Sequence, residues 1–208
     1  SGFQSIKSGD SKILIAGGQE NMSLAPHAVH IRDSKKLGNI SMIDTMIKDG
    51  LWDAFYDYHM GMTAENVATK FQVTRKDQDK FALSSQEKAL KAQKENKFTN
   101  EIVNFKIKSK KAEINFNKDE HPREGINIES LSRLKPVFKK DGTVTAGNSS
   151  GINDGAAALT LMSSEQAEKK NLKKLVSIKS WASCGVDPSI MGTGPIPSSK
   201  KALDLAGW

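Results

Sequence analysis

The sequence contains little cysteine and no long hydrophobic run. Cys184 is the single cysteine among 208 residues, which excludes an intrachain disulfide and indicates a compartment that keeps thiols reduced. No apolar stretch of about 18 residues occurs, so we expect no transmembrane helix and no membrane partner. No signal peptide is visible, and the expected location is cytoplasmic, or mitochondrial if a transit segment precedes Ser1.

Charge of one sign is not concentrated in any stretch of the chain. The formal net charge is +7, which would suit nucleic acid, anionic lipid or a polyanionic small molecule. The lysines are interleaved with acidic residues, as in KDQDK and KAQKENK, so a solvated surface is the favoured interpretation. We therefore expect no nucleic-acid partner.

Apolar runs predict an α/β core with a large insertion. KILIAGG at 12–18 and AAALTLM at 156–162 are apolar throughout and predict two buried strands. The first run is short and does not alternate, which is typical of a parallel sheet covered on both faces. A third strand is predicted from KLVSIKSWAS at 174–183, and it would open a second α/β unit.

Capping signals predict the helices. Thr63 is the expected cap of a helix over 64–72, and Thr74 with Asp77 approximates a capping box for a helix that continues to about residue 95. One face of the second helix carries a modest apolar stripe, made of Phe81, Ser85, Ala89 and Ala92. Further helices are expected after Ser163 or Ser164 and, at the end of the chain, after Ser198 or Ser199.

The segment at 101–117 predicts a two-stranded hairpin. In EIVNFKIKSKKAEINFN the apolar residues alternate with polar ones, and the lysines fall on the opposite face. We expect the apolar face of this hairpin to be buried.

Few side chains carry a chemical signal of their own. His27 and His30 have no further ligands nearby, so no metal site is expected, and the Gly-Thr-Gly at 192–194 lacks a phosphate-loop pattern. Cys184 is interpreted as a small buried hydrophobe. His59 is interpreted as structural, and Arg123 as a solvated residue whose type can also bind a phosphate or stack on a base.

The loop TAGNSSGINDGAAA at 145–158 is the most informative stretch, because its glycines allow a backbone to approach a ligand closely. Other long motifs accompany it in order along the chain: AGGQENMSLAPH, MIDTMIKDGLWDAFYDYHMGMTAENVA, DQDKFALSSQ, LKPVFKKDGTVTAGNSSGINDGAAALTLM, GVDPSIMGTGPIP and KKALDLAGW. By these motifs the chain resembles the biosynthetic type of the thiolase family, the acetyl-CoA C-acetyltransferases, from about residue 4 to 208. Departures from the family pattern occur at Gln19, Asn104 and Ser149, which are not chemical positions.

The resemblance implies a partial thiolase-like fold of layered α/β core segments with an inserted α+β loop domain. Residues 1–18 would be first-half core, 19–147 the loop domain, 148–172 the returning core strand and helix, and 173–208 the start of the second half. The stretch near 28–45 resembles the loop by which family members form homotetramers.

The resemblance also implies a binding site for coenzyme A. By motif, Leu51, His59 and Met60 would line the pantetheine and acyl channel, and Arg123 and Ser130 would lie near the adenine nucleotide. The pantetheine path would further be lined by Phe138, Ala146 and Ser150, with the Ser150 hydroxyl facing an amide.

Family chemistry is acyl transfer through a nucleophilic Cys, an activating His, a second Cys and a water held by an Asn. The resemblance places the nucleophile before Ser1 and the other groups after Trp208, and Cys184 matches neither cysteine. We therefore expect no catalytic residue and no cofactor in this chain, with a CoA thioester as the substrate, and no activity from the chain alone.

Three functional hypotheses remain open. The parent protein would condense two acetyl-CoA to acetoacetyl-CoA and CoA, reversibly, with this chain supplying the CoA-binding loop domain. The alternatives are a degradative 3-ketoacyl-CoA thiolase and a non-catalytic CoA-binding or assembly module. By resemblance, the dipeptide His59-Met60 favours the short-chain biosynthetic type.

Overall fold

The computed structural model describes residues 1–31, 37–108 and 113–208. The chain forms two compact units. The first consists of Ser1–Met60 together with Ile152–Trp208, and the second of Gly61–Gly151. No helix within the described residues is long and apolar enough to span a membrane.

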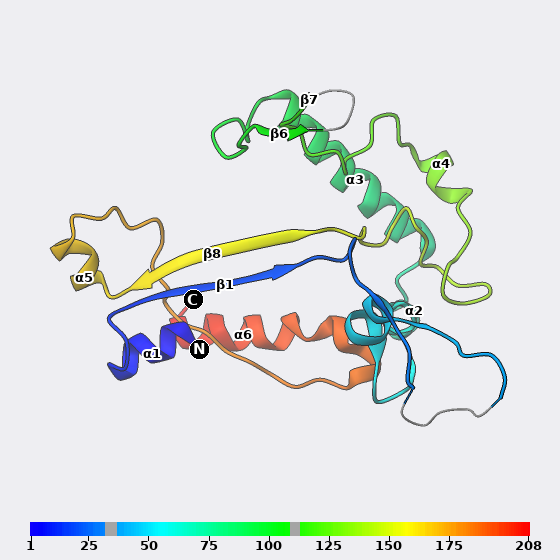
Figure 1. Ribbon diagram of the computed structural model, residues 1–208, viewed down its shortest axis with the longest axis horizontal. Coiled ribbons are helices and arrows are strands. Elements are labelled where there is room, and N and C mark those ends of the chain that lie inside the picture. The colour runs from blue at the N-terminus through cyan, green and yellow to red at the C-terminus, as the bar shows by residue number, and fades with distance from the viewer. Residues whose placement is uncertain (32–36, 109–112) are drawn as a thin grey trace. The chain divides into compact units, whose positions relative to one another are not determined.

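Two long strands form the centre of the first unit. β1 (Ile13–Glu20) pairs with β8 (Gly155–Met162) along its whole length, from Ile13 opposite Met162 to Glu20 opposite Gly155 (Figure 1). Both strands are confirmed, but their predicted burial is wrong, because every residue of the two strands is exposed or half-buried. The predicted parallel arrangement is wrong for this pair, which is antiparallel. The run lacks alternation because small residues fill its second half: a Cβ on Gly17 would lie 2.6 Å from the Ala157 carbonyl oxygen.

A short helix covers part of one face of this ribbon. α1 (Gly2–Ser8) precedes β1, and a Cβ on Gly2 would lie 2.9 Å from Leu161 Cδ1 and 3.0 Å from Leu14 Cδ2. Leu14 and Leu161 are cross-strand partners, so they point to the same face. Ile15 points to the other face, where its side chain is 75% exposed. α1 was not predicted from the sequence.

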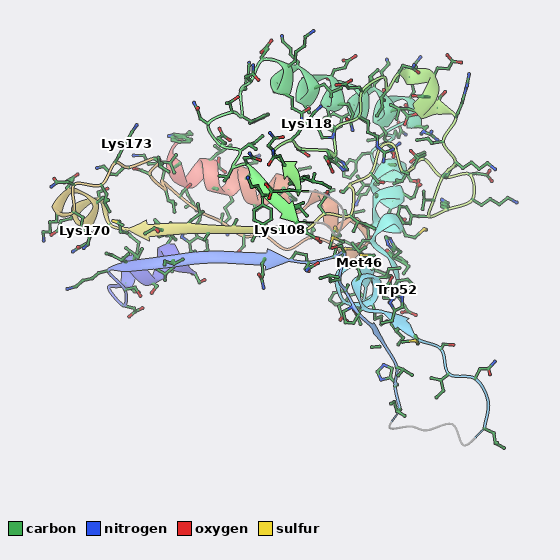
Figure 2. All side chains as sticks on the ribbon, turned by 45° about the horizontal axis from the view of Figure 1, so that its top comes forward. Met46, Trp52, Lys108, Lys118, Lys170 and Lys173 are labelled. Carbon is green, nitrogen blue, oxygen red and sulfur yellow. The ribbon has the colours of Figure 1, made fainter. Side chains whose placement is uncertain are left out.

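The segment after β1 contains several short elements. β2 (His27–Ala28) pairs with β3 (Ile43–Asp44), and β4 (Trp52–Asp53) pairs with β5 (Tyr58–His59). Between β3 and β4 lies η1 (Met46–Leu51), a single π-helical turn; Met46 at its start and Trp52 just after it are labelled in Figure 2. The predicted assembly loop at 28–45 includes residues 32–36, which lie outside the described residues.

The C-terminal part of the first unit is helical. α5 (Ser164–Lys169) is capped by the Ser163 hydroxyl, as predicted. η2 (Pro188–Thr193) is a 3-10 turn, and α6 (Pro195–Ala206) follows it. α6 begins before the predicted caps Ser198 and Ser199, because proline is favourable in a first helical turn.

The strand predicted at 174–183 is wrong. Within the described part of the chain no strand covers these residues, and Leu175 and Val176 are almost fully exposed. A strand needs a neighbouring strand to satisfy its backbone groups, and none pairs with this segment here.

Helices dominate the second unit. α2 (Met60–Lys70) starts at the last residue of the first unit, and α3 (Arg75–Lys94) and α4 (Ile128–Ser132) follow. Thr63 is buried inside α2, so its predicted role as the helix cap is wrong. The capping box of Thr74 and Asp77 is confirmed.

The predicted apolar stripe of α3 is wrong. Phe81 is 79% exposed and Ser85 is also exposed. The residue that α3 buries is Asp79, whose carboxylate accepts hydrogen bonds from Arg75 of the same helix and from the Asn148 side chain. The most buried residue of this helix is therefore a charged one.

The predicted hairpin is confirmed as a pairing. β6 (Phe105–Lys108) and β7 (Glu113–Phe116) are antiparallel, with Phe105 opposite Phe116 and Ile107 opposite Ile114. Lys108 and Lys118, labelled in Figure 2, mark the end of β6 and the segment after β7. The predicted burial is wrong, because all four apolar side chains are exposed, with Phe105 at 65%. The turn at 109–112 lies outside the described residues.

Candidate functional site

The predicted site residues are divided between the two units. Leu51, His59 and Met60 belong to the first unit. Arg123, Ser130, Phe138, Ala146 and Ser150 belong to the second. Each group is built from its own elements.

A tight turn positions His59. The buried Asp53 carboxylate accepts hydrogen bonds from the backbone N–H groups of Phe55 (2.9 Å) and Tyr56 (2.7 Å), which closes the turn between β4 and β5. Trp52 Nε1 donates to Asp57 Oδ1 at 2.8 Å, and Asp57 has the positive φ that lets the chain reverse. The two strands then place His59 opposite Trp52.

His59 is half-buried, as are the two other predicted site residues of the first unit. Of these two, Leu51 ends η1 and Met60 begins α2. Burial lowers the pKa of His59 below its ordinary value of 6.5, because a partly desolvated imidazolium is less stable than the neutral ring. A neutral imidazole near pH 7 has one donor and one acceptor nitrogen.

Aromatic residues support the same turn. The Tyr56 and Tyr58 rings stack with centroids 5.7 Å apart and planes 8° from parallel. The Tyr56 hydroxyl donates to Asp187 Oδ1 at 3.4 Å, and the charge of Asp187 raises the pKa of Tyr56. The same carboxylate oxygen of Asp187 accepts from the Ser189 N–H at the start of η2. The turn before His59 is thus tied to a second loop of the first unit.

In the second unit, Phe138 packs against a glycine of α2. A Cβ on Gly61 would lie 2.3 Å from the Phe138 ring, so only glycine leaves room for the ring there. Nearby, the Val137 N–H donates to the Val144 carbonyl at 3.0 Å, which joins the two sides of the loop that follows Phe138. These contacts position Phe138, which is predicted to line the pantetheine path.

A buried carboxylate holds this loop. Glu65 of α2 is 3% exposed, and it accepts hydrogen bonds from three donors of the loop. The Thr143 N–H lies 2.7 and 2.9 Å from its two oxygens, the Thr143 hydroxyl lies 2.9 Å from Oε2, and the Val144 N–H lies 2.8 Å from Oε1. A Cβ on Gly142 would lie 2.4 Å from Glu65 Oε1, so the contact also depends on a small residue.

A second buried carboxylate extends the network. Asp79 of α3 is 3% exposed and accepts from Arg75 Nε at 2.8 Å and from Asn148 Nδ2 at 3.0 Å. Asn148 Oδ1 in turn accepts from the Thr145 N–H at 2.7 Å. Ala146 lies inside this Thr145–Asn148 turn, and Ser150 follows it; both are exposed. Ala146 and Ser150, which are predicted to line the pantetheine path, thus lie in or next to a turn that the hydrogen bonds of Asn148 hold in place.

Arg123 and Ser130 belong to the same unit and precede Phe138 in the sequence. The Arg123 N–H donates to Gln86 Oε1 of α3 at 3.0 Å, and its side chain is exposed. Ser130 belongs to the capping box of α4: its N–H donates to Asn127 Oδ1 at 2.8 Å, and its hydroxyl donates to the Asn127 carbonyl at 2.8 Å. Arg75 binds the opposite, C-terminal end of α4, because its Nη2 donates to the carbonyls of Leu131 (2.7 Å) and Leu134 (3.0 Å).

Basic side chains line a hollow of about 610 Å³ at the C-terminal end of α3. Its lining residues are Leu90, Lys91, Gln93, Lys94, Lys118 and Glu124.

Cys184 is exposed, so its interpretation as a buried hydrophobe is wrong. Among the described residues, no three His, Cys, Asp or Glu side chains are grouped as metal ligands would be.

The residues that sequence reasoning missed are polar side chains, of which Glu65 and Asp79 are buried and the others half-buried. Glu65, Arg75, Asp79, Thr143 and Asn148 hold the loop, although none of them was a candidate. A signal was available, since an acidic residue on the buried face of a helix must find donors. The sequence could not say which donors, because Glu65 and Thr143 are 78 positions apart.

Comparison with known proteins gives a consistent result. A family model described as "Thiolase, N-terminal domain" matches residues 1–165. A protein named acetyl-CoA acetyltransferase of Rhizobium meliloti (strain 1021) is 57% identical over 100% of this chain and 53% of its own length, and the cytosolic acetyl-CoA acetyltransferase of Rattus norvegicus is 52% identical over 99% and 52%. The chain therefore spans about half the length of the curated relatives that it matches.

Solved structures are similar over the same extent. The Bacillus anthracis acetyl-CoA acetyltransferase matches with a TM-score of 0.90 and 44% identity, over 98% of this chain and 52% of that one. Human mitochondrial 3-ketoacyl-CoA thiolase in complex with CoA matches with a TM-score of 0.89 and 41% identity, over 99% and 51%.

Proposed function

Because this chain belongs to the thiolase family, we propose that its protein catalyses the reversible condensation of two acetyl-CoA molecules to acetoacetyl-CoA and CoA. The predicted thiolase-like α/β fold is confirmed by the likeness to solved structures. The observation that supports the proposed reaction is agreement along the whole chain with proteins named acetyl-CoA acetyltransferase. In this reaction the thioester bond of one acetyl-CoA and a methyl C–H bond of the other break, and a carbon–carbon bond forms between the two acetyl groups. The proton from the methyl group balances the CoA thiolate, which leaves as the thiol.

The role of this chain in the proposed enzyme is to bind coenzyme A. Phe138, Ala146 and Ser150 form what we call the pantetheine wall, with the Ser150 hydroxyl as its hydrogen-bonding group. The wall combines an aromatic ring, a methyl group and a hydroxyl, which suits a ligand arm that is half apolar and carries amides. Arg123 and Ser130 would lie near the adenine nucleotide.

The acyl end of the ligand is assigned to the first unit. Leu51 and Met60 supply apolar surface, and the neutral His59 supplies a hydrogen-bonding group that adds no buried charge. The CoA thioester is the substrate, and the reaction needs no metal. The groups that do the chemistry would lie in parts of the protein beyond these 208 residues.

Turnover tests the proposed reaction. The full-length enzyme is expected to cleave acetoacetyl-CoA when CoA is added, whereas the 208-residue chain alone is expected to show no turnover. Normal turnover by the isolated chain would contradict the assignment of all catalytic groups to other segments.

Ligand binding separates a retained CoA site from a purely structural piece. In calorimetry of the 208-residue chain with CoA, the substitutions Arg123→Ala and Ser150→Ala should each weaken the binding of CoA. Matched controls are Arg133→Ala, an exposed arginine paired with Glu129, and Ser149→Ala at the neighbouring exposed serine. Binding without turnover in the full-length protein would instead support a non-catalytic CoA-binding module.

A second candidate is a degradative 3-ketoacyl-CoA thiolase, favoured by the likeness to the human mitochondrial enzyme. The two candidates differ in the acyl chains that they accept. Measuring kcat/KM for 3-ketoacyl-CoA substrates of increasing chain length would decide, with a steep decline beyond four carbons expected for the acetyl-CoA enzyme.

Assembly and location are part of the same proposal. We assign residues 19–147 to the inserted loop domain and the stretch near 28–45 to a homotetramer contact in a cytoplasmic enzyme. Light scattering of the full-length protein tests the tetramer, and a monomeric mass would contradict it.

A further inference from the structure

We propose that Glu65 is a positioning residue for the pantetheine wall, a role that rests on the proposed function. The feature behind it is a carboxylate that is only 3% exposed: its oxygens accept hydrogen bonds from the Thr143 N–H, the Thr143 hydroxyl and the Val144 N–H, at 2.7–2.9 Å. Burying a carboxylate is costly unless donors replace its water. These donors all come from one loop, so the carboxylate and the loop fix each other.

The loop held in this way carries the wall. Residues 139–149 connect Phe138 to Ser150 and include Ala146, and Glu65 binds this connection near its middle, at Thr143 and Val144. Each end has its own attachment: Phe138 packs on Gly61, four positions before Glu65 in α2, and Asn148 donates to Asp79. Without Glu65, the loop would keep its ends and lose its centre.

Gln78 makes the Thr143 hydroxyl part of the same arrangement. Gln78 Nε2 donates to Thr143 Oγ1 at 2.8 Å, and that hydroxyl then donates to Glu65 Oε2. Hydrogen bonds to an ionised acceptor are the stronger kind. A glutamine at position 65 that keeps its oxygen on the Thr143 and Val144 N–H groups turns its NH₂ group toward the Thr143 hydroxyl, and that hydroxyl then loses its acceptor.

The effect on catalysis should be selective. Ser150 and Phe138 act on the pantetheine arm, so displacing them weakens binding of that arm and leaves the acyl chemistry in place. In the full-length enzyme, Glu65→Gln is expected to raise KM for acetoacetyl-CoA about tenfold with little change in kcat. The short thioester acetoacetyl-N-acetylcysteamine, which lacks most of the arm, should lose much less of its kcat/KM than the CoA substrate.

A milder pair of variants keeps the test valid if Glu65→Gln does not fold. Thr143→Val removes only the hydroxyl contacts, whereas Thr143→Ser keeps them. We expect Thr143→Val to raise KM for acetoacetyl-CoA several-fold and Thr143→Ser to restore the wild-type value. Equal losses of kcat/KM for the long and short thioesters would overturn the positioning role, as would a Thr143→Val enzyme with unchanged KM. If the wild-type enzyme itself fails to turn over acetoacetyl-CoA, it is the proposed function that fails.

Discussion

Several glycines of the second unit act by leaving space for a neighbouring side chain. A Cβ would lie 2.3 Å from the Phe138 ring at Gly61, 2.4 Å from Glu65 Oε1 at Gly142, and 2.6 Å from the side chains of Leu131 and Leu134 at Gly147. None of these three needs a positive φ. These positions therefore require glycine for its small size rather than for its backbone freedom.

Gly61→Ala should therefore displace Phe138. Adding a methyl group to a filled site typically costs about 1–3 kcal/mol, because the neighbours must shift. Urea unfolding of the full-length protein should show this loss, and KM for the CoA substrate should rise. Gly50→Ala is the control, since a Cβ there meets nothing within 4 Å. Equal stability of the two variants would contradict the packing of Phe138 on Gly61.

His59 should make the protein more sensitive to acid. Its folded-state pKa is below 6.5 because of burial, so between that pKa and 6.5 the unfolded state binds more protons. The stability that His59 contributes is therefore complete above this window and is lost as the pH falls through it. The melting-temperature difference, wild type minus His59→Asn, should decrease from pH 7.5 to pH 5.5. A constant difference would show that His59 titrates alike in both states.

Local sequence signals predict the residues of the proposed pantetheine wall but not the side chains that hold their loop. Phe138, Ala146 and Ser150 lie in a long motif, so resemblance could single them out. Glu65 and Asp79 bind loops that are 78 and 69 positions away, and no local pattern specifies such partners. Their buried state followed from the fold alone.

Elements with a cap of their own were predicted best. α3 begins where the Thr74 and Asp77 side chains each bind the other residue's backbone N–H, and α5 begins at the Ser163 hydroxyl. The start of α6 was misplaced because Pro195 begins a helix without a side-chain cap. The strand at 174–183 failed because strands depend on a partner, which a sequence pattern cannot supply.

Thr74→Ala should loosen the first turn of α3. Losing an N-cap typically costs about 1 kcal/mol, which corresponds to roughly fivefold faster opening of the turn. Hydrogen exchange should show this increase for peptides that cover Asp77 and Gln78, whose N–H groups lie in that turn. Thr99→Ala, which removes a hydroxyl contact after the helix, should leave those peptides unchanged. An unchanged rate in Thr74→Ala would mean that tertiary contacts alone hold the turn.

The chain as a whole exposes far more surface than its mass requires. Its accessible area is 16838 Å², whereas about 9,500 Å² is expected for one compact domain of this mass and about 11,500 Å² for two. Apolar side chains such as Ile15 and Leu159 contribute to the excess. Surface of this kind normally meets other protein.

The isolated 208-residue chain should therefore self-associate through the open face of its ribbon. Ile15→Lys should shift the chain toward monomer in light scattering at micromolar concentration, because a charge on that face disfavours edge-to-edge and face-to-face contact. Gln19→Lys adds the same charge on the same face without removing an apolar group. If both variants behave alike, net charge rather than the Ile15 side chain controls association.

The pairing of β1 with β8 also means that β1 has no partner strand during much of translation. Roughly 140 residues separate the two strands, so at about 5–20 residues per second β1 leaves the ribosome roughly 7–28 s before its partner. The whole of the second unit, Gly61–Gly151, is translated within that interval. A chaperone that shields β1 from the nascent chain's neighbours would thus have its greatest effect on yield before β8 emerges.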